Sequence, residues 1–177
     1  MTNVVYVHSI HPNESNPKEL GHILKKMGYL VRDGRYKNTT RSRYFEQLIR
    51  RFNAYAIDAH EGSHACPTVL ELIVPNGIFF DRIKDELFSL KSFYRIEVMD
   101  EKVSERVIHG REYILHNGRY EKTKRYWTGA PRQYSRQMKL GPRYLLVEMH
   151  TNERDIKKSK TVKRMINFLD LLSDLNS

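Results

Sequence analysis

The chain has 177 residues, with 31 lysine and arginine side chains against 21 aspartate and glutamate, and a net charge of +10. Apolar residues make up 40% of it and charged residues 29%, a balance that excludes both a disordered tail and a membrane-embedded chain. No apolar run approaches the roughly 18 residues needed to span a bilayer, and no secretory signal is evident at the N-terminus. The single cysteine, Cys66, excludes a disulfide framework and a cysteine-rich zinc module. We therefore expect a cytoplasmic protein of one domain spanning 1–177, with no membrane partner.

The first half of the chain predicts strands and helices in succession. Residues 4–10 form an apolar run before the breaker-rich segment 11–17, and we expect them to form a strand. A helix should follow, with Asn16 as its N-cap, Pro17 at its first position and Gly28 as its stop. The remaining expectations are a basic loop over 31–42, a helix over 43–55, a strand over 68–74 and a helix over 78–90.

The second half contains the clearest local signal, Asn117-Gly118 between two strand-like runs. Asn-Gly favours the positive φ angles of a type I′ turn, so we predict a β-hairpin that pairs 107–116 with 119–127. The other predicted elements are a strand over 94–99, a basic loop over 132–143, a strand over 143–150 and a helix over 153–172. With about four helices and no strict alternation of strand and helix, the pattern predicts an α+β domain with a largely antiparallel sheet.

Positive charge is concentrated in two parts of the sequence. Residues 101–164 carry 17 lysine and arginine against 7 acidic side chains, and 32–51 are also basic, whereas 52–100 are acidic. Clustered cations attract a polyanion and release its counterions. The charge pattern thus predicts a nucleic acid, DNA or RNA, as the partner.

The predicted strand 119–127 and the loop after it interleave cations with aromatic rings. Such a ribbon presents charge to phosphates and flat rings to bases. The alternative is a solvated hairpin whose tyrosines pack on the sheet. The residues expected to bind nucleic acid are Arg119, Tyr120, Lys122, Lys124, Arg125, Tyr126, Trp127, Arg132, Tyr134, Arg136 and Lys139, widened by Lys157, Lys158, Lys160 and Arg164 and by Arg35, Lys37, Arg41 and Arg43.

Residues 60–64 match the zinc motif H-E-x-x-H. On a helix, His60 and His64 would chelate zinc, and Glu61 would activate water. However, Gly62 and Ser63 lie inside the match and Pro67 follows it, which favours a polar turn instead of a helix. His8 and His11, at the end of the first strand, are predicted to be turn residues.

Glu148 and His150 lie two residues apart on the predicted strand 143–150, and so share one face. A carboxylate pair holding magnesium beside a basic groove would describe a nuclease. The usual alternative for such residues is a solvated sheet margin.

Three functions therefore compete. The leading hypothesis is a non-enzymatic nucleic-acid-binding protein without a cofactor. The second is a metal-dependent hydrolase, either a zinc enzyme built on His60, Glu61 and His64 or a magnesium nuclease built on Glu148 and His150. The third is an interaction protein that grips an acidic partner protein.

Overall fold

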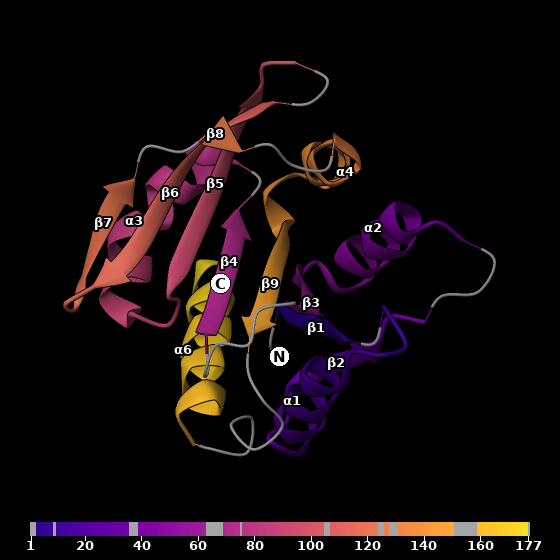
Figure 1. The fold of residues 1–177 in the computed structure, drawn as a ribbon. Coiled ribbons are helices and arrows are strands. Elements are labelled where there is room, and N and C mark those ends of the chain that lie inside the picture. Colours follow the sequence, from indigo (N-terminus) through magenta and orange to yellow (C-terminus); the bar gives the residue numbers. More distant parts are fainter. Residues whose placement is uncertain are drawn as a thin grey trace.

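The structure, a computed structural model, describes residues 3–8, 10–35, 39–62, 69–74, 76–104, 107–123, 126–127, 131–150 and 159–176, with the backbone alone for 69, 126–127, 131–134 and 159. In this part of the chain, nine strands form one sheet in the order β2-β1-β3-β9-β4-β5-β6-β7, and β8 pairs with β6 (Figure 1). The strands are β1 (Val4–His8), β2 (Leu30–Asp33), β3 (Tyr55–Glu61), β4 (Val69–Val74), β5 (Arg95–Lys102), β6 (Ile108–His116), β7 (Arg119–Thr123), β8 (Tyr126–Trp127) and β9 (Tyr144–His150).

Five α-helices lie among the described residues, against about four expected. They are α1 (Ser15–Lys26), α2 (Arg41–Phe52), α3 (Gly77–Leu90), α4 (Pro131–Leu140) and α6 (Ser159–Leu175). The additional helix, α4, occupies the segment 132–143 that the sequence predicted as a basic loop. A short 3-10 turn, Gly141–Arg143, joins it to β9.

The sheet is mixed, so the prediction of a largely antiparallel sheet was wrong. Strands β2, β1, β3 and β9 run parallel, β4 is antiparallel to β9, and β4 and β5 are again parallel. Parallel neighbours need helical crossovers, and the chain supplies them as β1-α1-β2, β2-α2-β3 and β4-α3-β5. Strand β2 overlaps the start of the predicted loop 31–42, and only a short apolar stretch signals it.

The predicted hairpin is confirmed. Asn117 and Gly118 both have positive φ, 48° and 75°, and His116 pairs with Arg119 across the turn. The second arm pairs as far as Thr123, and β8 then pairs with the beginning of β6.

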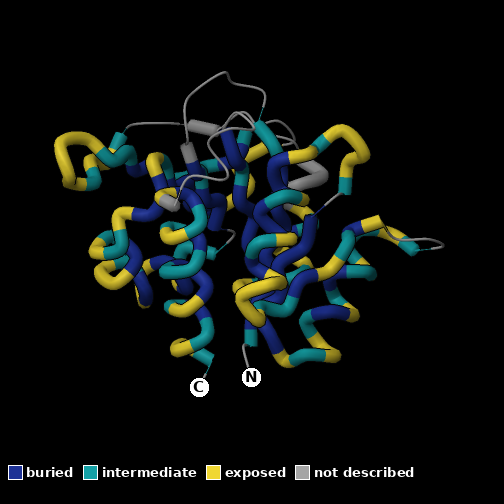
Figure 2. The backbone as a smooth tube through the Cα atoms, turned by 90° about the horizontal axis from the view of Figure 1, so that it is seen from below, coloured by how far each residue is buried: buried dark blue, intermediate teal, exposed yellow. Residues whose placement is uncertain are grey.

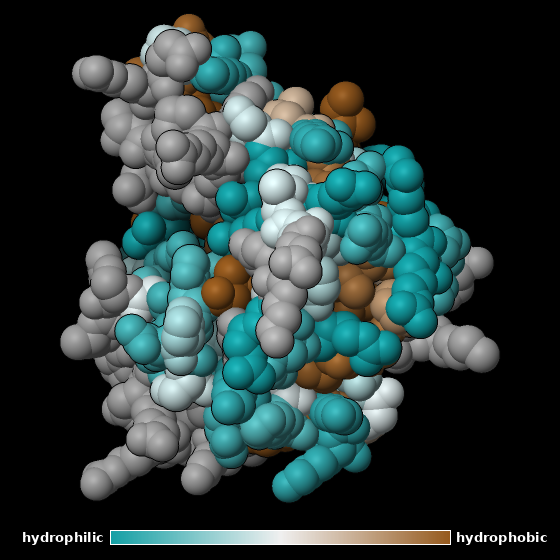
Figure 3. All heavy atoms as spheres, turned by 90° about the vertical axis from the view of Figure 1, so that its right-hand side faces the viewer, coloured by the Kyte–Doolittle hydropathy of each residue, from teal (hydrophilic) through white to brown (hydrophobic). Residues whose placement is uncertain are grey.

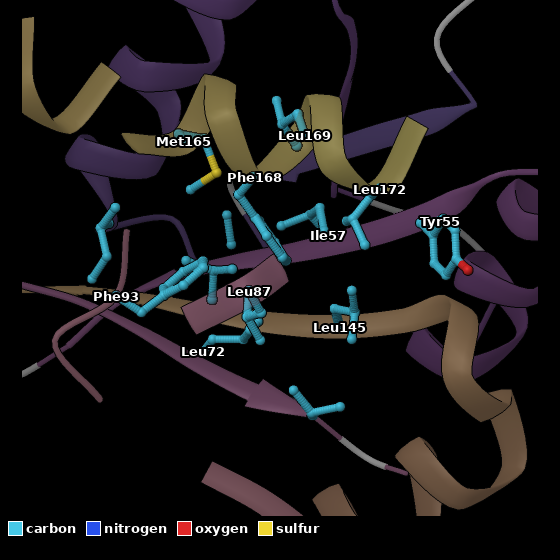
Figure 4. Close-up of a cluster of buried hydrophobic side chains, with 14 of the residues drawn as sticks. Tyr55, Ile57, Leu72, Leu87, Phe93, Leu145, Met165, Phe168, Leu169 and Leu172 are labelled. Carbon is cyan, nitrogen blue, oxygen red and sulfur yellow. The ribbon is translucent and has the colours of Figure 1, made fainter. Parts of the chain in front are cut away.

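Helices cover both faces of the sheet. The larger core lies between the sheet and α1, α3 and α6, and Figure 4 shows Met165, Phe168, Leu169 and Leu172 of α6 directed at sheet residues such as Ile57. On the other face, α2 packs its Phe45 against Tyr144 of β9, with ring centroids 4.9 Å apart. Two layers of helices thus enclose the parallel half of the sheet.

Burial is greatest along the sheet, and the two ends of the chain lie side by side (Figure 2). Asn176 joins them, because its carbonyl accepts from the Asn3 side chain and its own side chain donates to the Asn53 carbonyl. On the side that carries α1, α2 and β2, hydrophilic side chains dominate the visible surface, with apolar groups between them (Figure 3). Among the described helices, none has both the length and the apolar character to cross a membrane.

Candidate metal centre

The candidate site lies where β1 and β3 end. The chain leaves β1 for β2 on one side and returns to β3 on the other, so the connections diverge between these two neighbouring strands. Such a switch point, at the carboxyl ends of parallel strands, is where open α/β sheets bind ligands. His11 and Glu14 belong to the connection from β1 to α1, and His60 lies near the end of β3.

Three potential metal ligands converge there: His11, Glu14 and His60 each place a ligand atom within 4.8 Å of the other two. Glu14 Oε1 lies 3.2 Å from His60 Nδ1, and the rings of His11 and His60 have centroids 5.3 Å apart. Two atoms bound to one tetrahedral zinc at about 2.05 Å would lie about 3.3 Å apart. The spacing of Glu14 and His60 therefore fits a shared metal ion.

The start of α1 positions Glu14. Glu14 is the N-cap of the helix, and its Oε1 accepts from the backbone N–H of Glu61 at 3.2 Å. The Glu61 carboxylate in turn accepts from the backbone N–H and the side-chain amide of Asn16, at 3.3 and 3.0 Å. Asn16 is thus inside the first turn and is not the predicted N-cap, and Glu61 ties the helix to β3.

The second carboxylate oxygen of Glu14 differs from the first in its surroundings. Oε2 is buried and has no hydrogen-bond partner among the described residues. Buried carboxylate oxygens are normally satisfied by a donor, an ordered water or an ion. Burial opposes ionisation of Glu14, but the hydrogen bond and charge of His60 outweigh it and hold the pKa of the carboxyl below its ordinary value. An ionised, half-satisfied carboxylate is what a cation site requires.

Behind His60, Asp58 fixes the ring. Asp58 is fully buried, and its Oδ1 lies 2.8 Å from His60 Nε2, the nitrogen that faces away from Glu14. The other oxygen of Asp58 accepts from the Arg41 guanidinium and the Tyr144 hydroxyl. A carboxylate on the far nitrogen of a histidine is the usual way in which proteins orient a metal-binding imidazole.

The carboxylates of this network favour the charged form of His60, whereas the charge of Arg41 opposes it. Burial alone would raise the pKa of Asp58, but its contacts with His60, Arg41 and Tyr144 hold that pKa below the ordinary value. Burial would likewise lower the pKa of His60, but the hydrogen bonds and charges of Asp58 and Glu14 raise it to about 9. Asp58 and Glu14 therefore favour positive charge at the position of the His60 ring.

The carboxyl group of Glu148 lies beside this cluster. Glu148 of β9 is the register partner of His60 across the parallel pair β3–β9, so both side chains project from the same face of the sheet. Its side chain is 35% exposed. Burial and then the charge of Glu71 raise the pKa of Glu148 above its ordinary value. A partly exposed carboxyl with a raised pKa, next to a candidate metal site, suits a group that accepts a proton.

The H-E-x-x-H interpretation is corrected by the structure. His60 and Glu61 lie on strand β3, neither on a helix nor in the favoured polar turn, so they point to opposite faces of the sheet. Glu61 is engaged with the start of α1, and His64 lies outside the described residues. Of the three motif residues, the structure places only His60 in a ligand cluster.

His11 and Glu14 are the members of the candidate ligand cluster that sequence reasoning missed. His11 was predicted to be a turn residue, and it does follow a strand end, but the turn brings it to His60. The available signal was a histidine and a glutamate three residues apart, directly after a strand buried along its whole length. Glu148 and His150 were predicted to share a face, and they lie within ion-pair distance of each other, 3.8 Å.

The predicted nucleic-acid-binding residues are dispersed. Arg119 and Lys122 lie exposed on β7 at one edge of the sheet, whereas Arg35 follows β2 at the opposite edge and pairs with Asp33. Arg41 is largely buried against Asp58. The remaining described cations lie on helices that cover opposite faces: Arg43 on α2, Arg136 and Lys139 on α4, and Lys160 and Arg164 on α6.

The aromatic side chains of the predicted ribbon are accounted for only in part. The ring of Tyr120 stacks on Phe88 at a centroid distance of 4.5 Å, and its hydroxyl donates to the Phe93 carbonyl. The structure describes only the backbone of four predicted binding residues: Tyr126, Trp127, Arg132 and Tyr134. Five others lie wholly outside the described residues: Lys37, Lys124, Arg125, Lys157 and Lys158.

Comparison of the chain with models of protein families, with characterised proteins and with solved structures gave no significant match.

Proposed function

We propose that the protein is a zinc-dependent hydrolase, with His11, Glu14 and His60 as the metal ligands and Glu148 as the general base. The observation that carries this proposal is the convergence of the three ligand atoms within 4.8 Å at the carboxyl ends of β1 and β3. Two imidazoles with one carboxylate are a common ligand set of catalytic zinc, and the imidazoles favour zinc over magnesium.

Each side chain has a defined task in this proposal. Zinc, when bound, acts as a Lewis acid that makes a water molecule acidic. Asp58 and Arg41 hold the imidazole of His60 so that Nδ1 faces Glu14. Glu148, on the strand next to that of His60, would take a proton from that water and later deliver it to the leaving group.

The proposal is tested by metal analysis of the purified protein. We expect about one zinc per chain in the unsubstituted protein, and a loss of zinc in His11→Ala and Glu14→Gln. His116→Ala is the matched control, because His116 is exposed on the hairpin and pairs with Glu121. Zinc retained by both site variants, or lost equally from the control, would contradict the proposal.

The class of bond that the protein hydrolyses is tested with the unsubstituted protein and one further variant. We expect zinc-dependent hydrolysis of 4-nitrophenyl acetate that is lost in Glu148→Gln while zinc is retained. The nuclease alternative, built on Glu148 and His150 with magnesium, predicts instead that plasmid DNA or RNA is cleaved only when magnesium or manganese is supplied.

Nucleic-acid binding is the second candidate, favoured by the exposed cations Arg119 and Lys122 on the edge strand β7. Changing Lys122, Lys124 and Arg125 together to alanine should reduce the salt dependence of binding by about one unit of slope per lost phosphate contact. An unchanged slope in a gel-shift series at several salt concentrations would remove this ribbon from the proposal. Competition with heparin and with acidic proteins tests the third candidate, an acidic partner protein.

A further inference from the structure

A second polar cluster lies next to the proposed metal centre, on the same face of the sheet. It consists of Glu71 of β4 with Glu148 and His150 of β9. Glu71 and Glu148 lie directly opposite each other across the antiparallel pair β4–β9. His150 Nε2 lies 3.2 Å from Glu71 Oε2 and 3.8 Å from Glu148 Oε2, and the residue is only 5% exposed.

We propose that His150 is a positioning residue that holds the Glu148 carboxylate in place beside the metal centre, and that Glu71 in turn holds His150. This inference rests on the proposed function, in which Glu148 is the general base. It assigns positioning roles to His150 and Glu71, and no part in the chemical step.

The first argument is the arrangement of like charges. Two carboxylates directly opposite each other on neighbouring strands repel, and nothing in the pair itself would keep the Glu148 side chain in one orientation. His150 Nε2 lies within 4 Å of one oxygen of each carboxylate, so the imidazole stands between the two groups and contacts Oε2 of Glu148. The buried imidazole therefore limits the positions that Oε2 of Glu148 can take.

The second argument is that Glu71 is itself held from the far side. Arg95 of β5 lies 3.4 Å from Glu71 Oε1, so the two oxygens of Glu71 face different partners. The same guanidinium lies 3.5 Å from Glu97 and 3.6 Å from Glu112. A continuous line of charged groups across β6, β5 and β4 therefore ends at His150 and Glu148.

The third argument is the glycine that faces the ring. A Cβ at Gly62 would lie 1.8 Å from Cε1 of His150 and 2.2 Å from its Nδ1. The imidazole thus occupies the space that any side chain at this position would need. Gly62 directly follows β3, the strand that carries His60, so the backbone that supports the metal ligand also leaves room for the ring of His150.

The test compares three variants loaded with zinc. His150→Leu removes the nitrogen, His150→Gln keeps an N–H at a similar reach, and Gly62→Ala displaces the ring without removing an ionisable group. His116→Leu is the control, because His116 Nδ1 lies at a similar distance, 3.4 Å, from a glutamate but on the exposed hairpin. The readouts are zinc content, kcat and KM for 4-nitrophenyl acetate, and the affinity for acetohydroxamic acid, a small zinc-binding ligand whose hydroxyl can donate to the base.

We expect a fall in kcat of about 10–100-fold in His150→Leu and Gly62→Ala, the range typical of residues that orient a reacting group, with KM and zinc content near those of the unsubstituted protein. His150→Gln should recover most of the lost kcat, and acetohydroxamate should bind more weakly to His150→Leu by about the same factor as to Glu148→Gln.

Equal kcat and equal hydroxamate affinity in His150→Leu and the control would overturn the positioning role while leaving the zinc hydrolase intact. A loss of zinc from His150→Leu would also overturn it, because His150 would then act on the metal ligands. If the unsubstituted protein neither holds zinc nor binds acetohydroxamate through it, the proposed function fails, and the positioning role fails with it.

Discussion

Replacing Asp58 with asparagine gives the sharpest test of how the metal centre is supported. The substitution keeps the size of the side chain but removes the charge that Arg41 faces, and it changes the group that meets His60 Nε2. Asp58 is fully buried and the Arg41 side chain is 14% exposed, so the cation left behind would have little access to water. Removing one partner of a buried ion pair typically costs about 3–5 kcal/mol.

The same substitution should weaken zinc binding. Loss of the carboxylate that orients a metal-binding histidine typically lowers metal affinity about 10–100-fold. Both effects are measured on one preparation, the first by denaturant unfolding of the metal-free protein and the second by competition with a chelator. Asp33→Asn is the matched control, because Asp33 pairs with Arg35 on the surface, where the pair contributes little.

We expect Asp58→Asn to lower both stability and zinc affinity, and Asp33→Asn to leave both close to those of the unsubstituted protein. Equal values for the two variants would refute the reasoning, because a buried network cannot be removed without cost. A variant with reduced stability but full zinc affinity would mean that Asp58 supports the fold and does not orient His60.

Three further outcomes follow from single sites in the fold. Gly118→Ala should destabilise the protein by about 1–2 kcal/mol in denaturant unfolding, because Gly118 has φ of 75°; unchanged stability would mean that the hairpin turn relaxes. Phe168→Ala should cost about 3–5 kcal/mol, because Phe168 is fully buried against Phe93; a loss below 1 kcal/mol would contradict the packing of α6. Burial raises the pKa of Tyr120 to about 12, so the contribution of this shift to stability is complete below about pH 10 and is lost as the pH rises through 12. In a titration followed by phenolate absorbance, Tyr120→Phe should lack one group that ionises late. Loss of a group that ionises near pH 10 would contradict this.

Elements specified by local chemistry were predictable from the sequence. The hairpin turn needs positive φ at two adjacent positions, and Asn117-Gly118 is the strongest local signal for it. Helix α3 likewise shows its apolar stripe and its N-cap, Asn76, within one stretch of sequence. In each of these cases the residues that decide the structure are neighbours in the chain.

The parallel part of the sheet was not predictable in this way. Strand β1 is buried along its whole length, so it shows a continuous apolar run instead of the alternation that reveals a partner. Its neighbour β3 begins about fifty residues later. Strand β9, which pairs with β3, follows β4–β8 in the sequence. Strand direction depends on these distant pairings, which local periodicity does not record.

The candidate metal centre likewise combines a residue that a local motif identifies with residues that only distant contacts bring together. The sequence identified His60 as a potential ligand. The motif presumes a helix, however, and so names His64, four residues later, as the second ligand. The structure places His60 on a strand, where alternation turns the next residue, Glu61, to the other face. Its actual neighbours, His11 and Glu14, precede it in the sequence, and α1, β2 and α2 lie between them and His60.

X-ray absorption at the zinc edge of the zinc-loaded protein tests the metal centre most directly. The predicted result is one zinc per chain, bound by two imidazole nitrogens and by carboxylate oxygen at about 2.0–2.2 Å, with the imidazole signal reduced in His11→Ala. A spectrum without imidazole scattering, or one that His11→Ala leaves unchanged, would contradict the assignment of His11, Glu14 and His60 as the ligands.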